Sequence, residues 1–93
     1  MSLAAASVPR LPRGVRLQED RVRGGWVLLA PERAIALDAV GLAIISRIDG
    51  ARDFGAIVSD LSETYGAPEA EIARDSGEFI AALAERRVLE IMV

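Results

Sequence analysis

The segment Trp26–Asp38 (WVLLAPERAIALD) restricts the possible folds of this chain more than any other. Its first half is almost wholly apolar, Pro31 interrupts it, and in Arg33–Leu37 larger apolar residues alternate with alanine. Alternation with period two is typical of a strand with one buried face. Proline has no N–H to give to a sheet and belongs at a strand end or turn. We therefore predict two strands, Trp26–Ala30 and Arg33–Leu37, joined by a tight turn.

A third strand is predicted upstream, over Val15–Glu19, where apolar and polar residues also alternate. Gly24-Gly25 supplies the positive φ angles that the intervening turn needs. The three strands form an antiparallel meander in which Trp26–Ala30, apolar on both faces, is central. Trp26 is expected to anchor the sheet on the helices. The last strand, Arg33–Leu37, has one edge for which no later strand is evident. Such an edge is either protected against pairing with other chains or used to bind one.

Amphipathic patterns after the strands predict helices over Ala39–Ile48, Phe54–Tyr65 and Pro68–Arg87. Asp38 and Asp53 are placed as N-caps, and Gly50 and Gly66 stand where left-handed residues end helices. The apolar stripes expected to face the core are Val40, Ile44 and Ile48 in the first helix, Phe54, Ile57, Val58, Leu61 and Tyr65 in the second, and Ile72, Phe79, Ile80 and Leu83 in the third.

The two ends of the chain carry weaker patterns. Met1–Gly14, with Pro9 and Pro12, is predicted to be a flexible arm, although packing on a partner or a second copy stays open. Val88–Val93 is either a short return strand or a packed tail. The expected fold class is α+β: one winged helix-turn-helix-like domain over residues 15–93, with a three-stranded antiparallel sheet followed by three helices.

The composition excludes several kinds of chemistry. The chain has no Cys, no His and no Lys, so disulfides, thiolate and imidazole catalysis and Schiff-base formation are ruled out. Its Ser, Thr, Tyr and carboxylate residues show no spacing typical of an active site. We expect neither an enzyme nor a metal or other cofactor. No apolar run approaches the ~20 residues of a membrane span, and a cytoplasmic location without membrane contact is expected.

Charge is unevenly distributed. Residues 1–33 carry six Arg against three acidic residues (+3), and residues 34–93 carry five Arg against eleven (−6). The third predicted helix has three Arg, two of them in its last turn (Arg86 and Arg87), against five acidic residues (−2). A recognition helix of this sign repels phosphates, so nucleic acid is not an expected partner.

The open edge of Arg33–Leu37 suits strand addition, in which an extended peptide completes the sheet. If the third helix lies beside this edge, Asp75, Glu78, Ala82 and Arg86 would face the peptide. The alternative is that these are ordinary solvated charges on an exposed helix face.

The blocks Pro9–Leu17 (PRLPRGVRL), Trp26–Arg33 (WVLLAPER) and Ile48-Asp49-Gly50, with Leu37, Ile44-Ile45, Ile57, Leu61 and Tyr65, follow the order and spacing of one known family. The chain resembles the coenzyme PQQ synthesis protein D (PqqD) family over about Pro9–Val88. The resemblance implies a non-catalytic winged-helix peptide chaperone. It would bind the precursor peptide PqqA as an added strand and present it to the radical SAM enzyme PqqE, which cross-links a Glu to a Tyr.

Carried over by position, the resemblance implies a peptide-binding site between the third strand and the third helix. Its strand side is Arg33, Ala34, Ile35, Ala36, Leu37 and Asp38, and its helix side is Asp75, Glu78, Phe79, Ala82, Leu83 and Arg86. Two other functions stay open: a winged-helix DNA-binding domain, and a dimerisation domain that pairs the same edge with a second copy.

Overall fold

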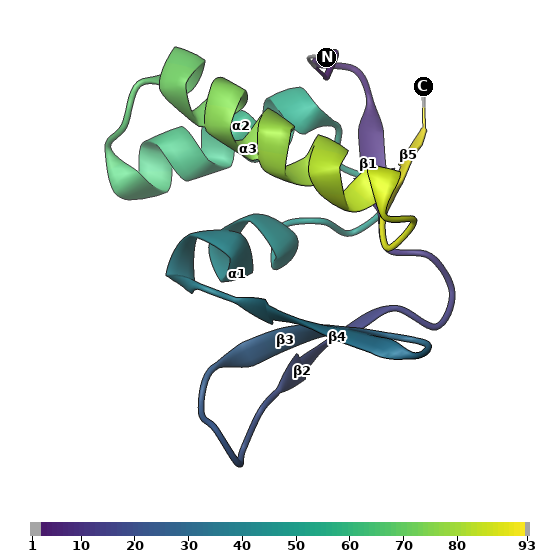
Figure 1. Ribbon diagram of the computed structural model, residues 1–93. Coiled ribbons are helices and arrows are strands. Elements are labelled where there is room, and N and C mark those ends of the chain that lie inside the picture. Colours follow the sequence, from purple (N-terminus) through teal and green to yellow (C-terminus); the bar gives the residue numbers. More distant parts are fainter. Residues whose placement is uncertain (1–2, 93) are drawn as a thin grey trace.

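The computed structural model describes residues 3–92. In chain order, these residues form β1 (Val8–Arg10), β2 (Arg16–Glu19), β3 (Trp26–Ala30), β4 (Arg33–Leu37), α1 (Ala39–Ile45), α2 (Phe54–Tyr65), α3 (Glu69–Glu85) and β5 (Glu90–Met92). Figure 1 shows α1 between the sheet of β2, β3 and β4 on one side and the pair α2 and α3 on the other. The mixed α+β class, with an antiparallel sheet and three helices, is confirmed.

The three-stranded sheet has the predicted order, β2-β3-β4, with β3 in the centre. Both pairings are antiparallel, and the register places Leu28 opposite Leu17 on one side and Ile35 on the other. Gly24 and Gly25 have φ angles of 82° and 84°, as the predicted turn requires. The tight turn between β3 and β4 consists of Pro31 and Glu32.

The predicted helix caps at Asp38 and Asp53 are confirmed. The Asp38 carboxylate accepts the Gly41 N–H at 2.7 Å, and the Asp53 carboxylate accepts the Ala56 N–H at 2.9 Å. Gly66 ends α2 in the left-handed conformation, with a φ angle of 66°. These caps fix where α1 and α2 begin and where α2 ends.

The first helix is shorter than predicted and ends at Ile45 rather than Ile48. The Ala43 carbonyl accepts hydrogen bonds from the Ser46 hydroxyl (3.1 Å) and the Arg47 guanidinium (2.8 Å). The backbone then tightens, and the Arg47 N–H bonds to the Ile44 carbonyl three residues back. Side-chain competition for one carbonyl therefore accounts for the early end. Gly50 has a positive φ angle, but it lies in the turn before α2.

The third helix differs from the prediction at both ends. Pro68 is its N-cap rather than its first residue, and the helix ends at Glu85. Arg86 is the C-cap, and Arg87 has a φ angle of 62°. These two arginines therefore lie past the last turn of α3 rather than in it.

The core lies between β3, the three helices and the segment before β5. Its most buried large side chains are Leu28, Ile45, Ile57, Ile80 and Leu89. Leu28, and not the half-buried Trp26, is the β3 residue that anchors the sheet.

Two apolar residues assigned to the core by periodicity are on the surface instead. Val40 and Tyr65 are 65% and 60% exposed. Val40 lies in the first turn of α1 and Tyr65 is the last residue of α2, so both extend past the packed part of their helices. The prediction that they face the core is wrong.

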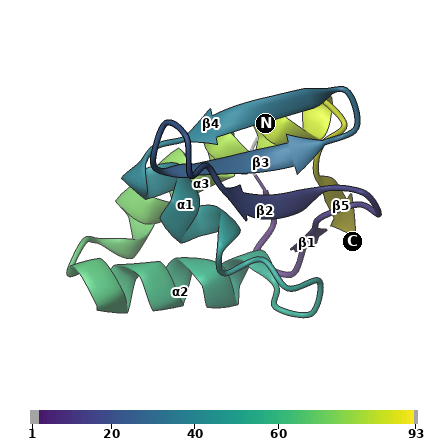
Figure 2. The same cartoon turned by 90° about the horizontal axis from the view of Figure 1, so that it is seen from below.

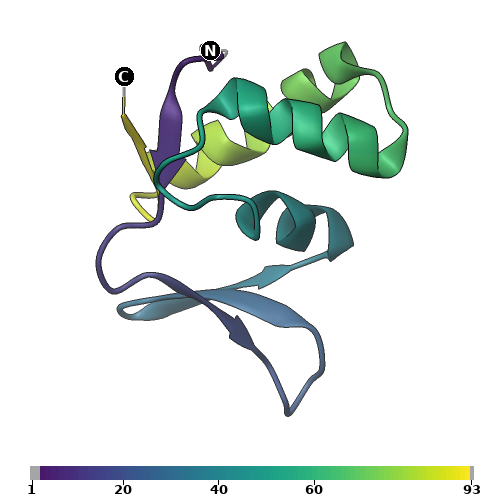
Figure 3. The same cartoon turned by 180° about the vertical axis from the view of Figure 1, so that it is seen from behind.

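The two ends of the chain pair with each other. β1 and β5 form a second, two-stranded antiparallel sheet, with Val8 opposite Met92 and Arg10 opposite Glu90. Figure 3 shows this pair beside the C-terminal end of α3. Val88–Val93 therefore includes the return strand, although Val93 itself, like residues 1–2, lies outside the described part of the chain.

The prediction of a flexible arm is wrong for the residues around β1. Ser7 and Pro9 are buried. The carbonyls of Ser7 and Ala5 accept the first N–H groups of α2, from Phe54 (2.7 Å) and Gly55 (2.9 Å). A helix start leaves such donors without intrahelical partners, and this segment supplies them. None of the described helices combines the length and hydropathy needed to cross a membrane.

Candidate peptide-binding site

The outer edge of β4 is open within the described chain. β4 pairs only with β3, while β1 and β5, the strands nearest the chain ends, pair with each other. The prediction that this edge has no strand partner in its own chain is therefore confirmed for residues 3–92.

The register of β4 shows which of its backbone groups face outward. The turn to β3 has two residues, so Ala30 and Arg33 are the pair that exchanges both hydrogen bonds. Such pairs alternate along an antiparallel ladder. Ala34 and Ala36 therefore direct their N–H and C=O groups away from β3. Two donors and two acceptors lie along the edge, next to small exposed side chains.

The other edge of the sheet, β2, is less suited to an added strand. Arg16, Gln18 and Glu19 are all exposed there, and charged side chains are a common way to protect an edge. The two edges also have different surroundings: Figure 2 shows β4 on the α3 side of the sheet and β2 on the α2 side.

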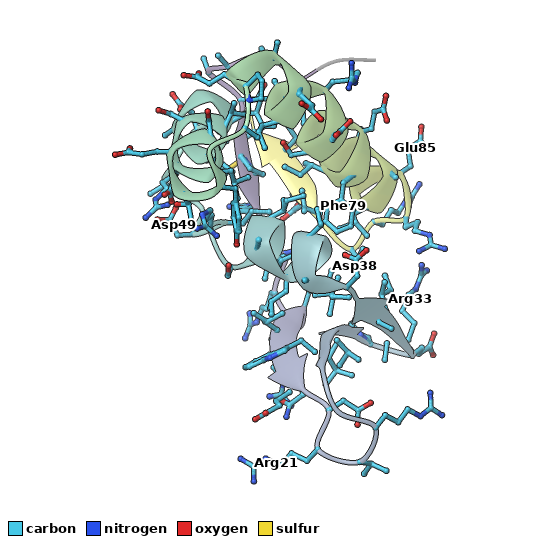
Figure 4. All side chains as sticks on the ribbon, turned by 90° about the vertical axis from the view of Figure 1, so that its left-hand side faces the viewer. Arg21, Arg33, Asp38, Asp49, Phe79 and Glu85 are labelled. Carbon is cyan, nitrogen blue, oxygen red and sulfur yellow. The ribbon has the colours of Figure 1, made fainter. Side chains whose placement is uncertain are left out.

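Phe79 of α3 and the end of β4 meet at one glycine of α1. A β-carbon placed on Gly41 would lie 3.2 Å from Phe79 Cζ, 3.3 Å from Asp38 Oδ1 and 3.3 Å from Leu37 Cδ2. Glycine permits this close approach, and a larger residue would push the strand and the helix apart. Figure 4 shows Phe79 and Asp38 together at the start of α1. We call the open edge Arg33–Asp38, with Gly41 and Phe79, the edge site.

The remaining predicted helix residues divide into three groups. Glu78, Ala82 and Arg86 are exposed, as a peptide-facing position requires. Asp75 is also exposed but lines a hollow formed with α1 and α2. Leu83 is only 4% exposed and belongs to the core, so a peptide cannot reach it in this structure.

Sequence reasoning missed Gly41, Val40 and Tyr65. Glycine in the first turn of a short helix is a weak signal, because Gly disfavours helix interiors by only about 1 kcal/mol. Val40 and Tyr65 fit the helical period, which placed them in the core. Only their positions at helix ends could have indicated exposure.

These features define a class of protein: a small α+β domain in which, over the described residues, one edge strand of the sheet has no strand partner and lies near a helix. Within that class, the chain belongs to the coenzyme PQQ synthesis protein D (PqqD) family, whose family model matches residues 25–89.

Three similar proteins illustrate the relationship. The PqqA binding protein of Rhizobium meliloti (strain 1021) is 49% identical over 90 residues, which cover 97% of this chain and 92% of the relative. The solution NMR structure of the PqqD truncation of Methylobacterium extorquens PqqCD has a TM-score of 0.81 and 45% identity, covering 96% of this chain and 95% of that one. It is described as a functional, stand-alone recognition element for ribosomally synthesized and post-translationally modified peptides (RiPPs). The crystal structure of PqqD from Xanthomonas campestris has a TM-score of 0.60 and 39% identity, covering 96% and 99%.

Proposed function

We propose that this protein is a non-catalytic recognition domain of PQQ synthesis, which binds the precursor peptide PqqA by strand addition at the edge site. One observation carries the proposal: β4 has an open edge whose outward N–H and C=O groups belong to Ala34 and Ala36, and α3 lies on the same side of the sheet. Main-chain hydrogen bonds of this kind supply affinity in peptide complexes formed by strand addition. The names of the relatives support PqqA as the peptide.

The site divides into a backbone part and a side-chain part. Ala34 and Ala36 offer hydrogen bonds that any extended peptide could make. Phe79 and the exposed positions Glu78 and Ala82 contribute the side-chain contacts that select one peptide over another. The acidic character of α3 favours a guest segment without negative charge.

Three further features belong to the proposal. The arrangement of helices and β-hairpin is that of a winged helix. The domain includes residues 5–10 as well as the predicted range 15–93, because β1 pairs with β5 and the carbonyls of Ala5 and Ser7, just before β1, accept the first N–H groups of α2. It presents the bound precursor to PqqE in the cytoplasm, where a ribosomally made peptide is first available.

The test is a titration of isotope-labelled protein with PqqA from the same organism, for the wild type and for Ala36→Pro. Proline removes the outward N–H but leaves the bonds of Ile35 and Leu37 to β3, and proline is tolerated on edge strands in this orientation. We expect the amides of Ala34 and Ala36 to shift on binding. Ala36→Pro should lower PqqA affinity by about tenfold, the effect of one lost hydrogen bond and a stiffened edge.

Ala36→Val is the matched control, because it changes the side chain and retains the N–H; its affinity should stay near that of the wild type. If Ala36→Pro is folded and binds PqqA as tightly as the wild type, strand addition at this edge is wrong. Sedimentation with and without peptide separates peptide pairing from pairing of the edge with a second copy.

A further inference from the structure

An apolar pocket of about 360 Å³ opens where the start of α1, the end of α2 and the first turns of α3 meet. This volume lies near the lower end of the range of about 300–1,000 Å³ typical of ligand pockets. The residues that matter here are Ala39, Val40, Ala43, Tyr65, Ile72 and Asp75. Val40 and Tyr65 are two of the three large hydrophobic side chains that the described residues leave exposed. Two of these three exposed side chains therefore line this pocket.

The exposed Tyr65 ring nevertheless has a neighbour within the protein. The Arg47 guanidinium lies 5.8 Å from the centroid of the Tyr65 ring, within the range of a cation–π contact. Arg47 is itself fixed by hydrogen bonds to the Asp60 carboxylate (3.0 Å) and the Ala43 carbonyl (2.8 Å). The ring, which lines the pocket, is therefore restrained before any ligand binds.

The two elements that form the edge site, β4 and α3, both lead into this pocket. On one side, the chain runs from Leu37 and Asp38, at the end of β4, directly into Ala39 and Val40. On the other side, Phe79 of the edge site and Asp75 of the pocket are four residues apart on α3 and so lie on one face of that helix. Figure 4 shows Phe79 and Asp38 near the start of α1, the helix whose first residues line the pocket. An extended peptide paired with β4 and continued past Asp38 enters the pocket within a few residues, at about 3.3 Å per residue.

We propose that the pocket seats a bulky apolar side chain of the same precursor peptide, a few residues beyond the segment that pairs with β4. This inference rests on the proposed function, because it takes PqqA bound at the edge site as its starting point. The lining is mainly apolar, and its one charged residue, Asp75, carries a carboxylate that disfavours an acidic side chain. The edge site supplies backbone hydrogen bonds that any sequence could make, and the pocket selects one side chain.

The test compares PqqA binding by the wild type, Val40→Asp and Tyr65→Ala. Both positions are exposed, so neither change removes core packing, and an acidic residue in the first turn of a helix favours that helix. Each variant should bind PqqA about tenfold more weakly, the loss expected when one apolar side chain loses much of its buried surface. The wild-type complex should show nuclear Overhauser effects from the Val40 methyls and the Tyr65 ring to one apolar side chain of the peptide.

Val22→Asp is the matched control, because Val22 is 94% exposed in the loop between β2 and β3; it should bind PqqA like the wild type. If the wild type binds PqqA with shifts at Ala34 and Ala36, but Val40→Asp and Tyr65→Ala bind equally tightly, the pocket inference alone is overturned. If the wild type binds no PqqA, the proposed function fails and this inference with it. If the two variants alter only self-association in sedimentation, the occupant is a second copy and the inference is wrong.

Discussion

Arg47 joins two helices of the molecule through one side chain. Its Nε donates to Asp60 at 3.0 Å, and its Nη1 donates to the Ala43 carbonyl at 2.8 Å. Arg52 also donates to Asp60, at 3.1 Å, and Asp60 accepts a weaker hydrogen bond from Thr64. This cluster attaches the end of α1 and the loop after it to the outer face of α2.

The cluster lowers the pKa of Asp60. Partial desolvation raises the pKa of this carboxyl, but the positive charge of Arg47 and the hydrogen bonds from Thr64, Arg47 and Arg52 outweigh it. A carboxyl with a lowered pKa stabilises the fold at pH values above its unfolded pKa. That contribution is lost as the pH falls through the folded pKa.

We therefore predict that Asp60→Asn lowers the melting temperature at pH 7. The difference from the wild type should begin to shrink as the pH falls below about 4, the pKa of an unfolded aspartate, and should disappear only once the pH has passed the lower pKa of the folded protein. Thermal melts followed by circular dichroism between pH 3 and pH 7 measure this. Glu63→Gln, an equal charge change at an exposed position of α2, is the control and should shift the melting temperature less at pH 7. A constant difference at all pH values would contradict the electrostatic explanation.

At the scale of the element, α3 contains a glycine that its surroundings do not require. Gly77 is buried near the middle of the helix, and a β-carbon placed there would meet only Phe54 Cζ, at 3.5 Å, an ordinary contact distance. A glycine in the middle of a helix either permits close packing or weakens the helix. The distance favours the second interpretation.

Gly77→Ala should stabilise the protein by about 1 kcal/mol, the helix propensity difference between the two residues. For a domain of this size the melting temperature should rise by about 5 °C. Gly66→Ala provides the opposite case, because the φ angle of 66° at the end of α2 disfavours any residue with a β-carbon; it should lower the melting temperature. A lower melting temperature for Gly77→Ala would show that α3 packs on Phe54 too tightly for a methyl group.

Local patterns predicted some elements well. Trp26–Ala30 and Arg33–Leu37 were predicted to the residue because strand alternation, a proline and a capping aspartate all lie within one short segment. The helix Phe54–Tyr65 was predicted equally well, since its strong helical period lies between an N-cap residue and a left-handed glycine. From these elements the open edge of the sheet followed directly.

Other features could not be predicted from local pattern. β1 and β5 have three residues each, too few to show a period. They pair with each other although almost the whole chain separates them in sequence. The early end of α1 depends on side-chain hydrogen bonds to Ala43, and the exposure of Val40 and Tyr65 depends on where neighbouring helices end. In the candidate site, the strand side followed from alternation, whereas Leu83 shows that the helix side depends on the rotation of α3, which sequence spacing does not determine.

For the whole molecule, the segment before β2 is a structural part of the fold. Ala5 and Ser7 accept hydrogen bonds from the first N–H groups of α2, and Val8–Arg10 pairs with Glu90–Met92. Deletion of residues 1–10 would leave two helix donors and one strand unpaired.

We predict that this deletion lowers the melting temperature by at least about 10 °C, because the lost hydrogen bonds contribute about 1 kcal/mol each and buried surface is lost as well. Arg10→Ala is the control: it removes only the exposed ion pair to Glu90 (3.1 Å) and keeps the β1 backbone, so it should cost less than about 1 kcal/mol. Calorimetry of the two proteins makes the comparison. An unchanged melting temperature after deletion would mean that the segment is dispensable.

The antiparallel register of β1 and β5 also places the first and last described segments next to each other, away from β4 (Figure 1). A short peptide linker could therefore connect them, so the protein should tolerate circular permutation with new ends in an exposed loop. For the same reason, a tether to another protein at either end would leave from the same region of the surface, and a guest strand on β4 would remain accessible.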